Sequence, residues 1–329
     1  MTKFRKIIAL LLVLVTVFSL ASCGEKEPVS EIDAAPTAEQ HEVADPDRGE
    51  NKVRVSAISA VGGFPILRLV LDREYAYTIV ERGVDSMKSA QLLKDNKVDI
   101  ASVRVDELPA IAAQTDIVVL AGLNNLVVSA IAKGDSGVKS IKDFSGKTVY
   151  CGGKDTLSQY VTEKAFADAG VNAELIFMSD DEVSLKLKSG EAEYAVLREP
   201  QAIYLVSEKS EFRRAFRVMD ADDIKADSCL VARADYVAKN PEIIKEIVTH
   251  VESCTNSLCT DGGKLYTSAE FVTAGYFSNN ETALNAISES GIAFTEKEEM
   301  KASINATLEF AGRYNSAITP LPDNAFYMG

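Results

Sequence analysis

The chain has 329 residues, a formal net charge of −14 at pH 7 and a hydrophobic content of 47%. A protein this acidic is a poor partner for nucleic acid or for an anionic membrane surface, so we expect neither to be bound through charge. Five cysteines and two histidines are spaced unlike any zinc-binding pattern, and we expect no metal and no cofactor.

The first 22 residues predict a lipoprotein signal peptide. Three basic residues within the first six positions precede an apolar run from Ile7 to Leu20. The run is too short to cross a hydrocarbon core of about 30 Å as a helix, so it indicates export rather than a membrane span. It ends in the letters LASC, which resemble the bacterial lipobox. The resemblance implies a lipid on Cys23; the alternative is an ordinary buried cysteine.

Residues 23–51 predict a disordered, lipid-bound tether. The segment is rich in Asp and Glu and almost without large apolar side chains, so it cannot offset the entropy of ordering. Without the three bases of the signal peptide, the formal net charge changes from −14 to −17. We expect a folded body anchored by Cys23 in the bacterial cell envelope, on the outer face of the cytoplasmic membrane or in the periplasm.

From Lys52 onward, short β-branched runs alternate with segments of helical period, which is typical of a parallel α/β sheet. We expect strands at 53–59, 77–81, 98–103, 116–123, 126–132, 147–153, 173–178, 192–197, 216–220 and 229–236. Between them we expect helices at 64–74, 86–94, 106–114, 156–169 and 181–188, the third capped by Asp106. The rest of the chain reads as wholly helical, at 241–258, 264–276, 281–290 and 296–314.

Four cysteines lie in the expected folded body: Cys151, Cys229, Cys254 and Cys259. Export permits disulfides, but the last two are five positions apart in an expected helix, about 140° around its axis, which is a poor geometry for a bridge. We expect mostly free thiols, and the pairing stays open.

The pattern of the first half begins again in the second. The segments "LKDNKVDIASVRVDELPA" (93–110) and "LKSGEAEYAVLREPQA" (187–202) align, which pairs Asp99 with Glu193 and Arg104 with Arg198. Two similar α/β units imply two lobes, each binding at the carboxyl ends of its strands. If those ends face each other, the ligand lies between the lobes. We place lobe one at 52–130 plus 233–329 and lobe two at 131–232.

The letters GDSG at 134–137 are those around the nucleophile of a chymotrypsin-like protease. Such a serine needs an imidazole to accept its proton and a carboxylate to orient that imidazole. The one histidine of the expected folded body, His250, lies within a helical stretch, and no G-x-S-x-G motif is present. We therefore interpret Ser136 as a turn residue between two glycines and the chain as no enzyme.

Several segments, in this order, resemble the solute-binding lipoproteins of ABC transporters: the lipobox, "VRVSAISAVGGFPI", "SIKDFSGKTVYCGGKDT", "LKSGEAEYAVLREP" and "LVARADYVAKNPEIIKEIV". The likeness covers 52–315 and is nearest to the nitrate, sulfonate and taurine type. It implies a type 2 periplasmic-binding fold, α/β with two Rossmann-like lobes, a central cleft, a two-strand hinge and a helical C-terminal part packed on lobe one. It also implies a monomer that hands a small anionic or zwitterionic organic solute to an ABC permease.

Three alternatives stay open. The scaffold also resembles binders of planar heterocycles such as a pyrimidine, a thiamine precursor. It resembles a pyrimidine synthase as well, although this chain lacks that enzyme's cysteine cluster and has no histidine in the cleft-forming segments. The third alternative is a surface lipoprotein that senses a ligand. Likeness of fold cannot choose among solutes.

Glycine turns after the first strand of each lobe are candidate ligand contacts. Free amides and the dipole of the following helix favour an anion there, and the alternative is a tight turn with no ligand. The contacts expected in lobe one are Gly62, Gly63 and Phe64. Those expected in lobe two are Gly153, Thr156, Leu157 and Ser158.

Polar residues at strand ends complete the predicted site. Arg104 and Arg198 end equivalent strands and would form a two-sided clamp on a carboxylate or sulfonate, because guanidinium groups offer paired donors. The alternative is that each arginine pairs with an acid near it in the sequence, such as Asp106 or Glu199. Glu199 is itself a candidate acceptor for an amine, and Asn125 a polar contact at the hinge.

Overall fold

The computed structural model describes residues 52–72, 75–219 and 224–329. The predicted signal peptide, Cys23 and the tether at 23–51 lie outside the described residues and stay predictions. Within the described ranges, no helix is both long enough and apolar enough to cross a bilayer.

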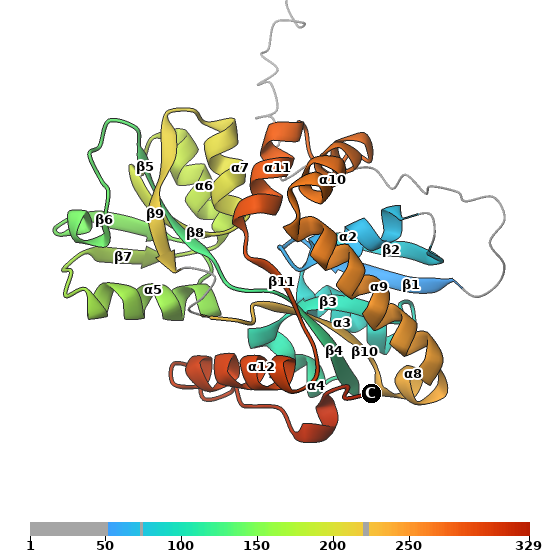
Figure 1. Cartoon of the computed structure of the whole chain (residues 1–329). Coiled ribbons are helices and arrows are strands. Elements are labelled where there is room, and N and C mark those ends of the chain that lie inside the picture. The colour runs from blue at the N-terminus through green and yellow to red at the C-terminus, as the bar shows by residue number, and fades with distance from the viewer. Residues whose placement is uncertain (1–51, 73–74, 220–223) are drawn as a thin grey trace, which may run out of the picture. The chain divides into compact units, whose positions relative to one another are not determined.

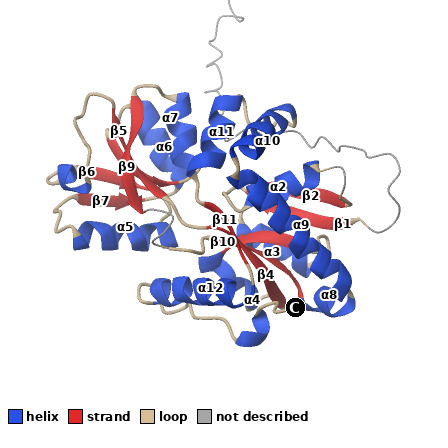
Figure 2. Cartoon of the chain, in the orientation of Figure 1, coloured by secondary structure: helices blue, strands red, loops and turns tan. Residues whose placement is uncertain are grey.

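Two β-sheets organise the described chain (Figures 1 and 2). Their strand orders are β11-β4-β10-β3-β1-β2 and β7-β6-β8-β5-β9. The first sheet consists of β1 Val53–Ile58, β2 Tyr77–Val84, β3 Ile100–Arg104, β4 Ile117–Asn124, β10 Ser228–Arg233 and β11 Ile292–Thr295. The second consists of β5 Val128–Lys133, β6 Thr148–Cys151, β7 Glu174–Phe177, β8 Tyr194–Arg198 and β9 Phe212–Met219. We call each sheet with its helices the first and the second lobe.

The two sheets repeat one topology. In the first, β2, β1 and β3 are parallel, and β10 runs antiparallel between β3 and β4. In the second, β7, β6 and β8 are parallel, and β5 runs antiparallel between β8 and β9. The predicted α/β fold with two similar lobes is confirmed.

The antiparallel strands β5 and β10 are also those that follow the two crossings between the sheets. The chain leaves the first sheet after β4 and enters the second as β5, and it returns after β9 as β10. The boundaries predicted at 130/131 and 232/233 therefore fall inside these strands. The sequence shows that a buried strand is present there, but not which sheet the strand joins.

The helices begin mostly where the sequence offers a cap. Asp85 accepts a hydrogen bond from the Lys88 amide at 2.7 Å, and Ser179 and Glu182 form a capping box. The helices of the N-terminal part and second lobe are α2 Gly63–Leu71, α3 Ser86–Lys94, α4 Leu108–Ala112, α5 Leu157–Asp168, α6 Asp180–Ser189 and α7 Gln201–Glu208. Those that follow are α8 Ala234–Lys239, α9 Pro241–Cys259, α10 Asp261–Thr273, α11 Asn280–Glu289 and α12 Lys297–Gly312.

Three expectations differ from the structure. The segment 106–114 is a 3-10 turn, Val105–Glu107, followed by the short α4, rather than one helix. The C-terminal part is not wholly helical, because β11 adds an edge strand beside β4. The end of the run expected as a strand at 229–236 belongs to α8.

The C-terminal helices pack on the first lobe. Ile247 and Val251 of α9 share an apolar cluster with strand residues Val55 and Leu230. On α12, the residues predicted to face a core are fully buried: Met300, Ile304, Leu308 and Ala311. The cysteines Cys151, Cys229, Cys254 and Cys259 are free thiols.

The GDSG segment is a turn at the end of β5. Ser136 Oγ donates to the Lys133 carbonyl at 2.7 Å, and Gly137 has a φ of +71°. His250 lies on α9 of the first lobe, where its ring stacks on Tyr75 with centroids 3.8 Å apart. Ser136 therefore has the geometry of the turn residue that the sequence predicts.

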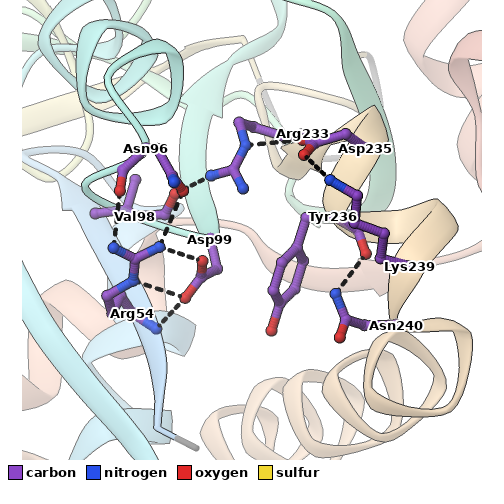
Figure 3. Close-up of polar contacts among 9 residues, drawn as sticks. All are labelled: Arg54, Asn96, Val98, Asp99, Arg233, Asp235, Tyr236, Lys239 and Asn240. Atoms are coloured by element: carbon purple, nitrogen blue, oxygen red, sulfur yellow. Dashed lines mark hydrogen bonds and ion pairs between the residues drawn. The ribbon is translucent and has the colours of Figure 1, made fainter.

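A polar network ties the start of β1 to the turn before β3 (Figure 3). Arg54 Nη2 lies 2.6 Å from Asp99 Oδ1, and Arg54 Nε donates to Oδ2 at 3.1 Å. The Arg54 amide donates to the same carboxylate at 2.8 Å, and Nη1 donates to the Asn96 carbonyl at 2.7 Å. Arg233, at the end of β10, donates to the Val98 carbonyl at 2.9 Å. The side chain of Asp99 is only 7% exposed, so the network fixes three strands at one end of the first sheet.

We expect Asp99→Ala to lower the free energy of unfolding by about 2–3 kcal/mol, because charge-assisted hydrogen bonds to a buried carboxylate are lost. The matched control is Glu193→Ala, at the position that the internal repeat pairs with Asp99. Its side chain is 57% exposed, and its Oε1 lies 3.6 Å from Lys133 Nζ, so its loss should cost less than about 1 kcal/mol. Urea unfolding at pH 7 measures both, and equal losses would contradict the structural role of Asp99.

Candidate functional site

The carboxyl ends of the parallel strands lie beside the amino ends of the two strands that follow the crossings. Ser228, the first residue of β10, is opposite Arg104 at the end of β3 and opposite Asn124 at the end of β4. In the second lobe, Val128, the first residue of β5, is opposite Arg198 at the end of β8. The topology therefore gives Arg104 and Arg198 equivalent positions, as the internal repeat predicts.

Several buried polar atoms at these strand ends have no hydrogen-bond partner. Most buried polar atoms in folded proteins are paired, so unpaired ones need an explanation. Those of the first lobe and the returning crossing are Asp106 Oδ1, Asn124 Oδ1, Asp227 Oδ1 and Ser228 Oγ. Those of the second lobe are Ser158 Oγ, Asp180 Oδ1 and the guanidinium nitrogens of Arg198. We call this set the polar interface.

Arg198 pairs with an acid of the returning crossing. Its Nη2 lies 3.1 Å from Asp227 Oδ1, and each side chain is 1% exposed. The distance establishes an ion pair, whereas the poor alignment leaves the guanidinium nitrogens without a hydrogen bond. Asn124 Nδ2 donates to the other oxygen of Asp227 at 3.1 Å. The alternative interpretation of the sequence, in which Arg198 pairs with Glu199, is wrong. The fold places Asp227, which is distant in sequence, beside Arg198 instead.

The charge of Arg104 acts on three carboxyl groups at the polar interface. Burial raises the pKa of Asp106, of Asp180 and of Asp227, and in each case the positive charge of Arg104 opposes that rise. These acids come from the first lobe, the second lobe and the returning crossing. Arg104 therefore acts electrostatically on both sides of the polar interface.

Asp106 joins the two lobes directly. Its Oδ2 accepts a hydrogen bond from the amide of Leu157, the first residue of α5, at 2.7 Å. The N-cap residue of α5, Thr156, makes no capping bond with its side chain, so Asp106 satisfies this helix end from the other lobe. The prediction that Asp106 caps its own segment is wrong. Burial raises the pKa of Asp106 to about 6, although the Leu157 amide and Arg104 act to lower it.

The glycine turn of the first lobe serves packing as well as the interface. A Cβ at Gly62 would overlap the side chain of Ser228, so Gly62 borders the polar interface. A Cβ at Gly63 would collide with the Ile58 carbonyl, and the Gly63 amide already donates within the turn. The structure thus explains Gly63 by close packing of the turn on β1, whereas a ligand contact at either glycine stays a prediction.

Phe64 belongs to an aromatic cluster. Its ring packs edge-on against Phe271 and Phe277, with centroids 6.0 and 5.8 Å apart. The side chain is 5% exposed. Its predicted contact with a ligand stays untested, and the packing alone accounts for an aromatic residue here.

In the second lobe, one predicted contact has unused hydrogen-bonding capacity. Thr156 Oγ1 donates to the Gly153 carbonyl at 2.6 Å, and the Leu157 amide is bonded to Asp106. Ser158, by contrast, is 1% exposed and its Oγ has no partner. Gly153 has a φ of +71°, which favours glycine whether or not a ligand binds.

Glu199 is already satisfied. Ser129 Oγ donates to its Oε1 at 2.6 Å, Arg214 Nη1 lies 3.2 Å from the same oxygen, and the Ile203 amide donates to Oε2 at 3.2 Å. Both oxygens therefore have partners, which makes Glu199 a structural acid in this arrangement rather than a free acceptor for an amine.

Asn125 contributes its backbone to the outgoing crossing. Its amide donates to the Gly291 carbonyl at 2.8 Å, and its carbonyl accepts from Asn124 Nδ2 at 2.9 Å. Asn124, which is 2% exposed, is the asparagine of this pair that enters the polar interface.

Further contacts hold the lobes together around the polar interface. Arg217 Nη2 lies 2.6 Å from Glu289 Oε2. The Tyr204 ring lies 5.7 Å from that of Phe277. On α5, Tyr160 stacks on a C-terminal tyrosine, with ring centroids 5.1 Å apart. The structure is therefore one in which residues of both lobes are buried against each other.

A family model described as NMT1/THI5 like matches residues 77–261, more than half of the chain. The chain belongs to the NMT1/THI5-like family. No curated protein matches it.

Solved structures share the fold of this NMT1/THI5-like protein at low sequence identity. An ABC transporter protein from Parabacteroides distasonis is 15% identical, with a TM-score of 0.68 over 85% of this chain and 99% of its own. The alkanesulfonate-binding protein SsuA from Xanthomonas axonopodis pv. citri, bound to MOPS, is 10% identical, with a TM-score of 0.63 over 86% and 100%. The nitrate-binding protein NrtA from Synechocystis PCC 6803 is 12% identical, with a TM-score of 0.60 over 83% of each chain.

Asp106, Asp180, Asp227 and Ser228 are interface residues that the predicted site omits. Asp227 directly precedes the returning strand and Ser228 is its first residue. The sequence does carry this position as a signal. Asp180 is the first of three consecutive acids at the start of α6. Acids are common at the start of a helix, so the sequence alone suggests no further role for Asp180. Only the fold brings these residues together.

The buried carboxyl of Asp106 predicts a pH-dependent stability that an amide would remove. Because its native pKa is about 6 and its ordinary value 3.8, the native state binds more protons than the unfolded state between these values. The contribution of Asp106 to stability therefore falls as pH rises through this window. Asp106→Asn keeps an acceptor for the Leu157 amide. The free energy of unfolding of this variant, relative to that of the unmodified protein, should therefore rise by about 3 kcal/mol between pH 3.5 and 7.5.

The charged groups that act on Asp106 are Arg104, Glu107 and Asp227, and these stay in place in the variant. Asp143→Asn is a control of opposite sign, because amides of Lys139 and Ser140 lower the pKa of that exposed carboxylate. The free energy of unfolding of Asp143→Asn, relative to that of the unmodified protein, should fall as pH rises. Urea unfolding at several pH values measures both variants, and a pH-independent effect of Asp106→Asn would refute the burial of a charged group here.

Proposed function

We propose that this protein is the extracytoplasmic solute-binding component of an ABC importer, which traps one small zwitterionic or anionic organic solute between its two lobes. The observation that carries this proposal is the polar interface. Asn124 Oδ1 and Ser228 Oγ from one side and Ser158 Oγ from the other are buried without partners. Each such atom costs about 1–3 kcal/mol when left unpaired, and a polar solute would remove that cost.

The topology suggests how the solute is captured. Two crossings connect the lobes, so the lobes can separate and close by changes within these few residues. Separation exposes the polar atoms to water, and closure exchanges that water for the solute. The Asp106–Leu157 hydrogen bond and the Arg217–Glu289 ion pair would then form only on closure. A solute that bridges the lobes favours the closed state by its greater affinity for it.

The proposal needs no catalytic group. It includes, as expectations from the sequence, a lipid on Cys23 as the anchor, an ABC permease as the partner and a monomeric state. Sulfonate and nitrate are ligands named for proteins that share the fold, and they define the first solutes to test, together with taurine.

Two serine variants test the site from both sides. Ser158→Ala and Ser228→Ala each remove one unpaired buried hydroxyl, so each should weaken solute binding at least fivefold while leaving the thermal midpoint of the unliganded protein unchanged or higher. The control is Ser207→Ala on α7, whose side chain is exposed. The full-length protein in detergent is first screened by thermal shift against sulfonates, taurine, nitrate, amino acids, pyrimidines and amines. Binding that survives both substitutions with full affinity would place the solute elsewhere.

A further inference from the structure

Helix α7 lies between its own sheet and α11 of the first lobe (Figure 1). Ala202 and Leu205 of α7 are buried in the apolar cluster of the second lobe. Ile203, about 100° from Ala202 around the helix axis, is buried in a different cluster, and the other buried members of that cluster belong to the first lobe. Ile203 is 1% exposed. The helix therefore places neighbouring side chains in the cores of both lobes.

The cluster that receives Ile203 is rich in aromatic rings. Phe271 and Phe277 lie parallel, with centroids 5.9 Å apart, and Phe64 packs edge-on against both. Tyr204, which follows Ile203 on α7, lies with its ring 5.7 Å from that of Phe277. Separation of the lobes would bring the apolar surface around Ile203 into water. Because burial of apolar surface is favourable, this contact stabilises the arrangement in which the lobes touch.

An ion pair connects α11 to the second lobe as well. The Oε2 of Glu289, the last residue of α11, lies 2.6 Å from Arg217 Nη2 and 3.6 Å from Arg214 Nη2, both on β9. Arg214 also lies 3.2 Å from Glu199 Oε1, and the other oxygen of Glu199 accepts a hydrogen bond from the Ile203 amide. One connected set of contacts therefore fixes the start of α7 and holds α11 against β9.

Ile203 and Glu289 do not belong to the polar interface. Ile203 is apolar, and the Glu289 carboxylate is shared by two guanidinium groups, so neither has hydrogen-bonding capacity reserved for a solute. Their contacts are nevertheless connected to the outgoing crossing, because the carbonyl of Gly291, two residues after Glu289, accepts from the Asn125 amide at 2.8 Å. They are therefore placed to act on the arrangement of the lobes rather than on the solute.

We propose that Ile203 and Glu289 form a latch between the lobes, which sets the equilibrium between their separated and closed arrangements and positions the solute site without touching the solute. This inference rests on the proposed function, because only lobes that separate need a latch. A latch that raises the closed fraction raises the apparent affinity for the solute in proportion, since only the closed state contacts the solute from both sides. Its ionic part is weakened by salt, whereas its apolar part does not depend on charge.

The Leu157 amide reports separation of the lobes, because its hydrogen-bond acceptor, Asp106 Oδ2, belongs to the other lobe. Hydrogen–deuterium exchange of this amide in the full-length protein without added solute, resolved by fragmentation mass spectrometry, measures how often the lobes separate. Ile203→Ala should speed the exchange at least tenfold, and Ile203→Val less than threefold, because valine keeps most of the buried surface. Glu289→Gln should speed it about threefold at low salt, and this effect should vanish in concentrated sodium chloride.

The matched control is Leu205→Ala, which removes an apolar side chain of the same helix from the core of the second lobe alone. It should lower the thermal midpoint at least as much as Ile203→Ala does and change the Leu157 exchange less than twofold. Unchanged exchange in Ile203→Ala, or equal acceleration by both variants, would overturn the inference and leave the proposed function standing. If the Leu157 amide of the unmodified protein exchanges only as slowly as the amides of the central strand β10, the lobes do not separate, and the proposed function fails together with the inference.

Discussion

The placement of the two crossings is the constraint on which the rest of the structure depends. Each crossing delivers its strand into the other lobe between two parallel strands, in the opposite direction. The first residues of that strand therefore lie beside the last residues of its neighbours. This geometry alone brings Ser228 opposite Arg104 and Asn124, and it brings the preceding Asp227 to Arg198 of the other lobe. A polar interface shared by both lobes follows from strand direction.

The same constraint makes this arrangement of the two lobes costly in free energy. The interface buries carboxyl, amide and hydroxyl groups that water would satisfy if the lobes separated, as the proposed function requires. Unpaired groups of this kind cost about 1–3 kcal/mol each, so the favourable apolar contacts between the lobes have to offset a considerable penalty. Apolar and aromatic contacts between the lobes, such as that of Tyr204 with Phe277, contribute to this offset. In the proposed function, a solute that filled this hydrogen-bonding capacity would remove the penalty, and this would couple its binding to closure.

The sequence predicts those parts of the fold that depend on local pattern. Alternation of strands and helices gives nearly all elements of the two sheets, and the internal repeat gives Arg104 and Arg198 their equivalent strand ends. It does not give β11, a four-residue edge strand inside a helical region, because so short a run has no distinct period. The sheet that a crossing strand joins is likewise decided by packing partners distant in sequence.

The candidate site divides in the same way. The glycine turns and Ser158 are recognisable because they follow strands and open helices. Tertiary contacts decide the other positions. Glu199 is paired with Ser129 and Arg214, and the Phe64 ring packs against two other rings, so neither side chain has unused capacity to bind a ligand. Asp106 is the clearest case. Its position suggests a local helix cap, but its carboxylate caps α5 of the other lobe. The sequence suggests that Asp106 caps the helix that it precedes, whereas the folded chain places its carboxylate at the start of α5, which is distant in sequence.

The two arginines of the internal repeat show how duplication leads to different roles. Arg198 is fully buried against Asp227, and removing either partner would leave an uncompensated buried charge at a cost of about 3–5 kcal/mol. Arg104 is only partly buried, and its charge acts on one carboxyl group from each lobe and one from the crossing. Arg198 therefore belongs to the scaffold that fixes the returning crossing, whereas Arg104 would set the electrostatic potential that a solute meets in the proposed function. The sequence repeat is symmetric, but only Arg198 forms an ion pair with the acid that the crossing contributes, and this contact gives the two arginines different roles.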